Sequence, residues 1–467
     1  MPRPRVHLTP ARGWLNDPNG LVHDGRRFHA FFQFHPDGLE WGPMHWGHAT
    51  STDLVAWVHD PEPALAPGPL GQAYSGSAVV DHHDTAGFGA GALVLVFTHA
   101  ASDRQVQSLA WSTDGATFTE AEGNPVLVAD DGIADFRDPK VLRWGGAVGH
   151  WALVLAAGDE IRLFTSPDLH RWTQTDAYRP EPAHRGALET PDLFPLTADD
   201  GTEHWVLTLG VLRGAPVGGS GAWAVAGSFD GERFRPTQPG RWVDHGADFY
   251  AAQSWSGVPD GRRIWTAWLS NWDHASALPA EGWRGQLAIP RELRLVRRGD
   301  GVHLVQQPVA ELRGWREEGW TAERWPMGAG APADVPASGA ALDVEVHGLG
   351  SAGIDLWCRR ADASLHVAVD PGRAELRVTV AHDAGTGATT VTRVRSAPLA
   401  TAPGDHLRVV LDLASAEVFL GPAAITELLP TLDEPWSVAL AAAGPSACEV
   451  GPVSVHPLGQ GNWRQTT

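Results

Sequence analysis

Short apolar runs separated by glycine and proline dominate the first two thirds of the chain. Runs such as Leu93–Phe97 and Trp205–Leu209 are brief and rich in β-branched and aromatic side chains, which is typical of buried strands. The 467 residues include 53 glycines and 36 prolines, and these punctuate the sequence too often for long helices. The pattern therefore predicts an all-β protein.

One turn pattern, Ser-x-Asp-(Leu/Gly)-x-x-(Trp/Phe), occurs four times along this part of the chain. Its aspartates are Asp53, Asp114, Asp168 and Asp230, and the steps of about 60 residues are somewhat longer than common propeller repeats. A turn followed by an aromatic residue at such spacing is typical of a β-propeller, where each unit is one four-stranded sheet. A divergent unit around Trp265–Leu295 brings the number of blades to five. The alternative is ordinary Asp-initiated hairpin turns in unrelated sheets.

The character of the sequence changes after about residue 297. Arg297–Gly301 is a turn and Pro308–Trp325 a mixed connector, whereas Leu342–His347 and Leu407–Leu413 alternate apolar and polar positions. Such alternation favours a β-sandwich. We therefore expect a five-bladed propeller over residues 1–297, a linker over 298–330 and a C-terminal sandwich over 331–467.

Three short motifs each place a carboxylate beside a proline. Asp17 lies in Trp14–Gly20 (WLNDPNG), Asp138 in Asp135–Lys140 (DFRDPK), and Glu189 in Leu188–Phe194 (LETPDLF). Taken singly, they read equally well as a solvated loop, a strand-end salt bridge and a loop acid. Together they supply what glycoside hydrolysis needs, namely a carboxylate at the anomeric carbon and a protonated carboxyl group for the leaving oxygen.

In this order the three motifs resemble the signature blocks of glycoside hydrolase family 32, which comprises invertases, inulinases and levanases. The resemblance covers about residues 5–300 and includes further segments, namely Phe31–Pro36, Trp41–His48, Tyr74–Ser77, Asp248–Ser254 and Trp283–Gly285. Within the family, Trp41–Ala49 and Trp265–Leu295 look more like levanases and exo-inulinases than plant invertases. The family's fold is a five-bladed propeller followed by a β-sandwich.

The resemblance implies a role for each matched residue. Asp17 would be the nucleophile, Glu189 the general acid that later acts as base, and Asp138 a transition-state stabiliser. The implied substrate-binding residues are Asn16, Gln33, Ser75, Arg137 and Asp248, with Trp41 and Trp268 as an apolar wall for the sugar. Thr190 departs from the pattern, because many relatives carry Cys after the acid/base; its hydroxyl could donate a hydrogen bond to the carboxylate.

Charge and composition narrow the class of protein. The net charge of −20 argues against nucleic-acid binding and suits a neutral sugar substrate. No apolar stretch is long enough for a membrane span, no Cys/His array has zinc spacing, and we expect neither metal nor cofactor. The two cysteines, Cys358 and Cys448, could equally form a disulfide or be two buried thiols.

The expected activity is a glycosidase that releases terminal β-D-fructofuranosyl residues from sucrose, fructo-oligosaccharides, levan or inulin through a fructosyl-enzyme. Alternatives are a fructosyltransferase with the same site, an inverting five-bladed furanosidase and a non-catalytic fructan-binding propeller. The start, Met1–His7, lacks an apolar signal core. We therefore expect a cytoplasmic protein, with secretion as the alternative if a signal peptide has been removed. The sequence indicates no oligomeric state.

Overall fold

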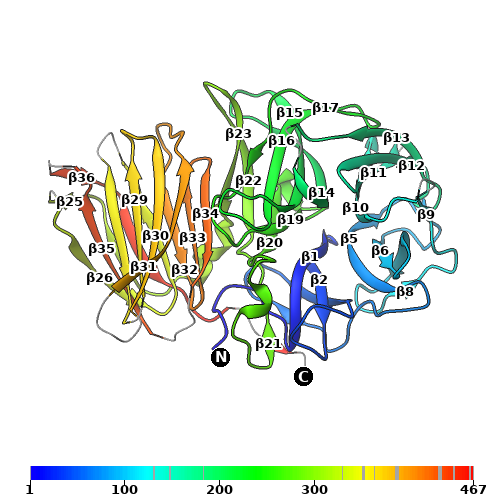
Figure 1. Cartoon of the computed structure of the whole chain (residues 1–467), viewed down its shortest axis with the longest axis horizontal. Coiled ribbons are helices and arrows are strands. Elements are labelled where there is room, and N and C mark those ends of the chain that lie inside the picture. Colours follow the sequence, from blue (N-terminus) through cyan, green and yellow to red (C-terminus); the bar gives the residue numbers. More distant parts are fainter. Residues whose placement is uncertain are drawn as a thin grey trace.

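The computed structural model describes residues 2–129, 132–146, 149–181, 184–328, 330–349, 353–361, 363–383, 389–429, 434–444, 447–461 and 464–465. Within these residues a ring of sheets lies beside a two-layered sandwich (Figure 1). The helical segments are short 3-10 turns, namely η2 (Pro259–Gly261), η3 (Ala275–Ala277) and η4 (Ala310–Trp315). No helix of the described residues is long and apolar enough to cross a membrane.

Five sheets in the described residues form the blades of a propeller, which confirms the predicted architecture. Blade 1 contains β1 (Gly13–His23), β2 (Phe28–His35), β3 (His45–Ser51) and β4 (Val58–His59). Blade 2 contains β5 (Gln72–Asp81), β6 (Ala92–Ala100), β7 (Gln105–Ser112) and β8 (Thr119–Glu120), with β9 (Leu127–Val128) paired to β7. Blade 3 contains β10 (Phe136–Trp144), β11 (His150–Ala157), β12 (Glu160–Ser166) and β13 (Thr173–Tyr178).

Blade 4 contains β14 (Arg185–Thr197), β15 (Glu203–Arg213), β16 (Gly221–Phe229) and β17 (Phe234–Pro236), with β18 (Arg241–Trp242) paired to β16. Blade 5 contains β19 (Tyr250–Ser254), β20 (Ile264–Trp268), β22 (Arg291–Arg298) and β23 (Gly301–Pro308). The innermost strands β1, β5, β10, β14 and β19 contact one another in that order, and β19 contacts β1. The ring therefore closes around a central channel.

The repeated Ser-x-Asp pattern forms the turn between the third and fourth strands of a blade. In blade 1 the Leu54 N–H donates to Ser51 Oγ (2.8 Å), and Asp53 Oδ1 accepts from the N–H groups of Val55 and Ala56 (3.0 and 2.8 Å). Blade 2 repeats these contacts. Blade 3 repeats the two bonds to the aspartate, and Ser166 Oγ there accepts from the Asp168 N–H (3.1 Å). Blade 4 repeats the two bonds to the aspartate. The repeat thus recurs because each turn must satisfy the same backbone donors.

The domain boundaries differ from those predicted. Strand β23 pairs with β22, so the propeller extends to Pro308 and not to residue 297. The sandwich already begins with β24 (Trp320–Ala322), which pairs with β37 (Val453–Pro457). Near the end of the chain, β38 (Arg464–Gln465) pairs with β4 of blade 1. The Arg297–Gly301 turn was therefore a hairpin inside the last blade and not the start of a linker.

Two six-stranded sheets of the described residues make up the sandwich. The first has the order β24, β37, β27 (Leu342–Val346), β32 (Leu407–Leu411), β33 (Ser415–Leu420) and β34 (Ala423–Leu428). The second has the order β26 (Ala333–Gly339), β35 (Trp436–Ala442), β28 (Ile354–Arg359), β29 (Ala363–Asp370), β30 (Glu375–Asp383) and β31 (Thr389–Pro398). A small sheet pairs β25 (Trp325–Met327) with β36 (Cys448–Val450), and β21 (Trp283–Arg284) runs parallel to β1.

Strand β27, whose alternating pattern predicted the sandwich, has one apolar face and one face with buried charged side chains. Leu342, Val344 and Val346 enter the sandwich core. Asp343, between them, is also buried and accepts from Arg408 Nε (3.0 Å) and Arg316 Nε (2.9 Å). Cys358 is buried in the core and Cys448 packs against it, both as free thiols, which settles the open question in favour of two thiols.

A buried ionic network joins the propeller to the sandwich. His7 contacts Asp412 Oδ2 through Nδ1 (2.8 Å) and Glu417 Oε1 through Nε2 (2.7 Å). Arg291 of blade 5 donates to Glu417 Oε2 through Nε (3.0 Å). Burial alone would lower the pKa of His7, but the hydrogen bonds and charges of Asp412 and Glu417 outweigh it and raise the pKa to about 9. The two carboxylates thus hold a charged imidazolium at the interface.

This network predicts a loss of stability at alkaline pH. Because the pKa of His7 is above the unfolded value of 6.5, its contribution is complete below about pH 6.5 and disappears as pH rises through about 9. We expect about 3 kcal/mol of unfolding free energy to be lost over this window. Thermal unfolding of wild type and His7→Gln across pH 6 to 10 measures it. The variant should show a smaller pH-dependent loss, and equal losses in the two proteins would contradict the assignment; the exposed His82→Gln serves as control.

Candidate active site

Every innermost strand breaks its register with the second strand of its blade at one of the sequence motifs. The breaks lie between Leu15 and Pro18, Tyr74 and Gly76, Arg137 and Lys140, Glu189 and Asp192, and Tyr250 and Gln253. A β-bulge bends the strand and redirects the side chain at the break. The five bulges therefore turn the motif residues toward one end of the central channel.

Two of these breaks contain a non-glycine residue in the left-handed region directly before a proline. Asp138 has φ 64° and precedes Pro139, and Thr190 has φ 46° and precedes Pro191. Such a backbone is unfavourable for residues with a side chain, and it persists where the surroundings impose it, as at functional sites. The Asp-Pro and Thr-Pro pairs therefore form two of the five bulges.

The bulges surround a cavity of about 400 Å³, which we call the upper cavity. It contains all the sequence-predicted site residues except Asp248 and Trp268, and its lining is Asn16, Asp17, Gln33, Trp41, Tyr74, Ser75, Gln105, Asp135, Arg137, Asp138, Glu189, Leu212 and Trp272. Trp41, at 43% exposure, forms part of the rim, whereas Asp17 and Asp138 are 9% and 5% exposed. The carboxylates therefore lie at depth and an aromatic ring at the entrance.

Asp17 is buried and held by two donors. Asn16 Nδ2 donates to Asp17 Oδ1 (3.1 Å) and Ser75 Oγ donates to Oδ2 (2.8 Å). Trp14 Nε1 donates to Asn16 Oδ1 (2.8 Å), which directs the amide nitrogen at the carboxylate. Burial and the charge of Glu189 raise the pKa of Asp17 to about 7, against the opposing hydrogen bonds. The two hydrogen bonds therefore hold the Asp17 carboxylate in one orientation, and burial shields it from water.

Glu189 is fixed from both sides. Arg137 donates to its Oε1 through Nη2 (2.9 Å) and Nε (3.2 Å). The Tyr250 hydroxyl donates to its Oε2. Tyr250 was not among the predicted site residues, although it lies in the Asp248–Ser254 segment that carried part of the resemblance. The hydroxyl expected from Thr190 makes no hydrogen bond to the described residues, so Tyr250 takes the donor role assigned to Thr190.

Asp138 completes a cluster of three acidic groups. Its Oδ2 accepts from the Thr190 N–H (2.9 Å), and its own N–H donates to Thr98 Oγ1 (3.0 Å). Burial raises its pKa to about 8; Arg137 opposes this, and the charges of Glu189 and Asp17 add to it. Like charges disfavour simultaneous ionisation, so Asp17 and Asp138 each hold their proton to a higher pH than an isolated aspartate does.

A search of known families matches residues 7–308 to the glycosyl hydrolases family 32 N-terminal domain. The chain belongs to glycoside hydrolase family 32. The matched range ends at the last residue of β23, so it coincides with the end of the propeller. In the described residues, no group of three or more His, Cys, Asp or Glu side chains is arranged to hold a metal ion.

Known relatives share both sequence and shape with this family 32 chain. A levanase from Bacillus subtilis (strain 168) is 46% identical over 335 residues, which is 69% of this chain and 49% of the levanase. The chain thus spans about half the length of that relative. A crystal structure of an exo-inulinase from Aspergillus awamori (28% identity, TM-score 0.83) and a structure of a β-fructofuranosidase from Schwanniomyces occidentalis complexed with fructosyl-erythritol (26%, 0.83) each match over 97% of both chains.

Two residues implied by the family 32 resemblance lie outside the upper cavity. Asp248 is fully buried, and its oxygens contact His274 Nε2 (2.7 Å) and accept from the Leu428 N–H of the sandwich (2.7 Å). With both oxygens occupied at the domain junction, Asp248 orients the loop that follows β20 and the edge of β34. Its assignment to sugar hydroxyls is therefore corrected.

Trp268 also lies outside the upper cavity, which is lined by another tryptophan of the same segment. Trp268 is 1% exposed, and its ring packs against Trp14 (5.9 Å between centroids) and Trp272 (4.8 Å). Trp272, four residues later in the loop, lines the upper cavity. Trp268 thus supports the Trp272 ring that lines the upper cavity. Sequence spacing could not distinguish the two, since both lie in one tryptophan-rich segment.

Proposed function

We propose that this family 32 protein is a retaining glycosidase that releases terminal β-D-fructofuranosyl residues from sucrose, fructo-oligosaccharides or fructans such as levan and inulin. The observation that carries the proposal is the pair Asp17 and Glu189, which face one cavity from β1 and β14 and are each held by dedicated donors. The names of the similar proteins, levanase, exo-inulinase and β-fructofuranosidase, support the substrate class.

In the first step Asp17 attacks the anomeric carbon while Glu189 gives its proton to the glycosidic oxygen. The leaving sugar departs and a fructosyl ester remains on Asp17. In the second step Glu189, now ionised, takes a proton from water, and the resulting hydroxide displaces Asp17. Arg137 and Tyr250 keep the Glu189 carboxyl in place through both steps. Asp138 hydrogen-bonds fructose hydroxyls more strongly as positive charge develops on the ring.

The test is incubation with sucrose, inulin and levan separately, followed by chromatography of the products. Free fructose as the only new monosaccharide from the fructans supports exo-hydrolysis. Longer oligomers or cyclic disaccharides would instead indicate fructosyl transfer through the same intermediate. If none of the three substrates is consumed, the proposal fails.

Stereochemistry provides a second test. A covalent fructosyl-enzyme requires carboxyl groups about 5 to 5.5 Å apart and two inversions, so the first fructose released should have the β configuration. NMR spectra recorded in the first minutes of reaction, before mutarotation, measure this directly. Initial α-fructofuranose would establish an inverting enzyme and exclude the ester on Asp17.

Ser75→Ala should change the pH dependence of the reaction. Ser75 donates to Asp17, and this hydrogen bond lowers the pKa of Asp17 against burial. Since Asp17 must be ionised to attack, kcat/KM falls as pH decreases through that pKa. Without the hydroxyl, the acid limb of kcat/KM should move to higher pH by about half to one unit. The control is Ser396→Ala on the exposed sandwich surface, and an unmoved acid limb in Ser75→Ala would contradict the prediction.

A further inference from the structure

A second cavity, of about 550 Å³, lies at the opposite end of the inner strands; we call it the basal cavity. Each of four inner strands gives an earlier residue to the upper cavity and a later one to the basal cavity. The pairs are Asp17 and Val22 on β1, Ser75 and Asp81 on β5, Asp138 and Trp144 on β10, and Glu189 and Pro195 on β14. The two cavities are therefore the two mouths of one channel.

The channel between the mouths is packed. Its middle, bounded by residues such as Pro18, Asp138 and Gln253, does not admit a water molecule. Just below, Lys140 Nζ donates to Asp192 Oδ2 (2.9 Å), to Gln253 Oε1 (3.3 Å) and to the Ser254 carbonyl (2.7 Å), so its three donors are used. A sugar in the upper cavity thus cannot reach the basal cavity. Any ligand of the basal cavity is therefore a separate molecule.

Basic side chains gather around the basal cavity, in a protein of net charge −20. Lys140, Arg143 and Arg263 line it together with His82 and His83. The lining carboxylate, Asp81, already accepts from Thr85 Oγ1 (3.1 Å) and from the N–H of Ala86 (2.8 Å). Cations gathered in a hollow attract anions more strongly than the same charges on an open surface.

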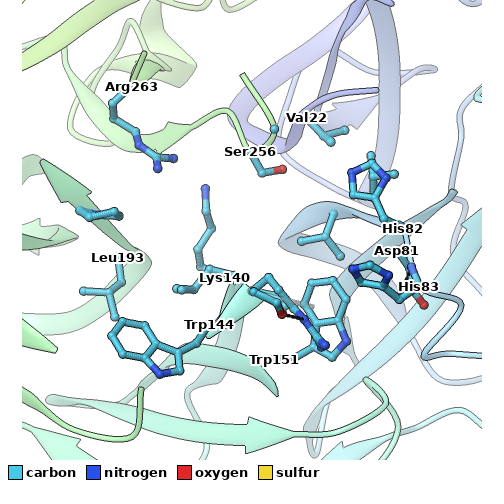
Figure 2. A pocket seen from close by; sticks show the side chains of 18 of the residues that line it. Val22, Asp81, His82, His83, Lys140, Trp144, Trp151, Leu193, Ser256 and Arg263 are labelled. Carbon is cyan, nitrogen blue, oxygen red and sulfur yellow. Dashed lines mark hydrogen bonds between the residues drawn. The ribbon is translucent and has the colours of Figure 1, made fainter. Parts of the chain in front are cut away.

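Arg263 has unused donors in this hollow. Its Nη1 makes two long hydrogen bonds, to the Trp255 carbonyl (3.2 Å) and Ser254 Oγ (3.4 Å). Its Nε is buried without a partner, and Nη2 makes no hydrogen bond to the described residues. Figure 2 shows the Arg263 guanidinium directed toward the open middle of the cavity. Burial lowers the pKa of Arg263, and the charge of Asp192 opposes this only in part.

The wall of the basal cavity is aromatic. Trp144, Trp151 and Trp205 line it, and the Arg143 guanidinium lies over the Trp151 ring, 4.9 Å from its centroid. Rings of this kind pack against the carbon skeleton of a sugar or of another compact metabolite. A planar guanidinium with open donors is complementary to a phosphate or a carboxylate, which can accept two parallel hydrogen bonds.

We propose that the basal cavity binds a small organic anion, with its phosphate or carboxylate group on Arg263 and its carbon skeleton against the tryptophans. The site is separate from the upper cavity, so it does not depend on the proposed glycosidase activity.

Isothermal titration of the intact chain with inorganic phosphate, citrate and fructose 6-phosphate tests the proposal, with fructose as the neutral comparison. We expect one saturable site for at least one organic anion, with a Kd below about 1 mM, and competition between the anions that bind. Preference among the three separates phosphate from carboxylate recognition. Arg263→Met should weaken binding by about tenfold or more, whereas Arg233→Met, which removes the same charge from an exposed turn of blade 4, should not.

A further pair of variants keeps the test decisive if Arg263→Met does not fold. His83→Glu places a negative charge on the exposed rim of the basal cavity and should weaken anion binding. Trp41→Ala, at the rim of the upper cavity, should leave it unchanged. The proposal is overturned if none of the anions binds saturably, if both Arg263→Met and His83→Glu bind as wild type does, or if Trp41→Ala abolishes binding.

Discussion

Asp17→Asn is expected to lower kcat on sucrose and fructans by about three orders of magnitude or more, with little change in stability or sugar binding. An amide has nearly the same shape as the carboxylate but is a poor nucleophile, so the loss falls on the chemical step. The donors Asn16 and Ser75 remain, and the amide oxygen can still accept one of their hydrogen bonds.

The measurement is steady-state kinetics together with a thermal unfolding curve and a fructose titration. Asp334→Asn, an exposed aspartate of the sandwich, makes the same chemical change away from the cavity and should behave as wild type does. If Asp17→Asn retains more than about a tenth of the wild-type rate, another group must attack the sugar. Lost activity accompanied by unfolding would instead assign Asp17 to the fold.

Glu189→Gln should abolish turnover of sucrose and fructans but spare the first step on an activated fructoside, whose leaving group needs no proton. Because the second step then lacks its base, fructosyl-enzyme should accumulate. Intact-protein mass spectrometry detects the added mass. Azide, a nucleophile that needs no deprotonation, should discharge the ester faster than water does. Wild-type rates on ordinary fructosides would make Glu189 a structural acid.

Asp192 is the matched control for Glu189 on the same strand. It is fully buried and paired with Lys140, and it also accepts from the Ser254 N–H (2.6 Å). Asp192→Asn should therefore lower stability, since it leaves the Lys140 cation buried without a counter-charge. It should not give an enzyme that accumulates fructosyl ester. A donor role for Asp192 requires contact with the upper cavity, whose lining does not include it.

Local sequence accounts for most of the propeller. The Ser-x-Asp turns could be recognised because each is complete within about six residues and satisfies its own backbone donors. The end of the last blade could not be placed, because Arg297–Gly301 has the same turn chemistry whether it joins two strands of one blade or two domains. The pairing of β38 with blade 1 joins residues about four hundred positions apart and has no local signature.

The three motif carboxylates were determined by the sequence itself, since a bulge needs particular residues at its own positions, and Asp-Pro and Thr-Pro occupy the strained ones. Which aromatic and polar groups surround those carboxylates was decided only by the tertiary structure. Tyr250 contacts Glu189 because β19 lies beside β14 in the closed ring. Asp248 lies outside the cavity, where its carboxylate accepts a hydrogen bond from the Leu428 N–H of the sandwich. These contacts depend on how the blades and domains pack. A residue's neighbours from distant segments cannot be recognised from the amino acids next to it in the sequence.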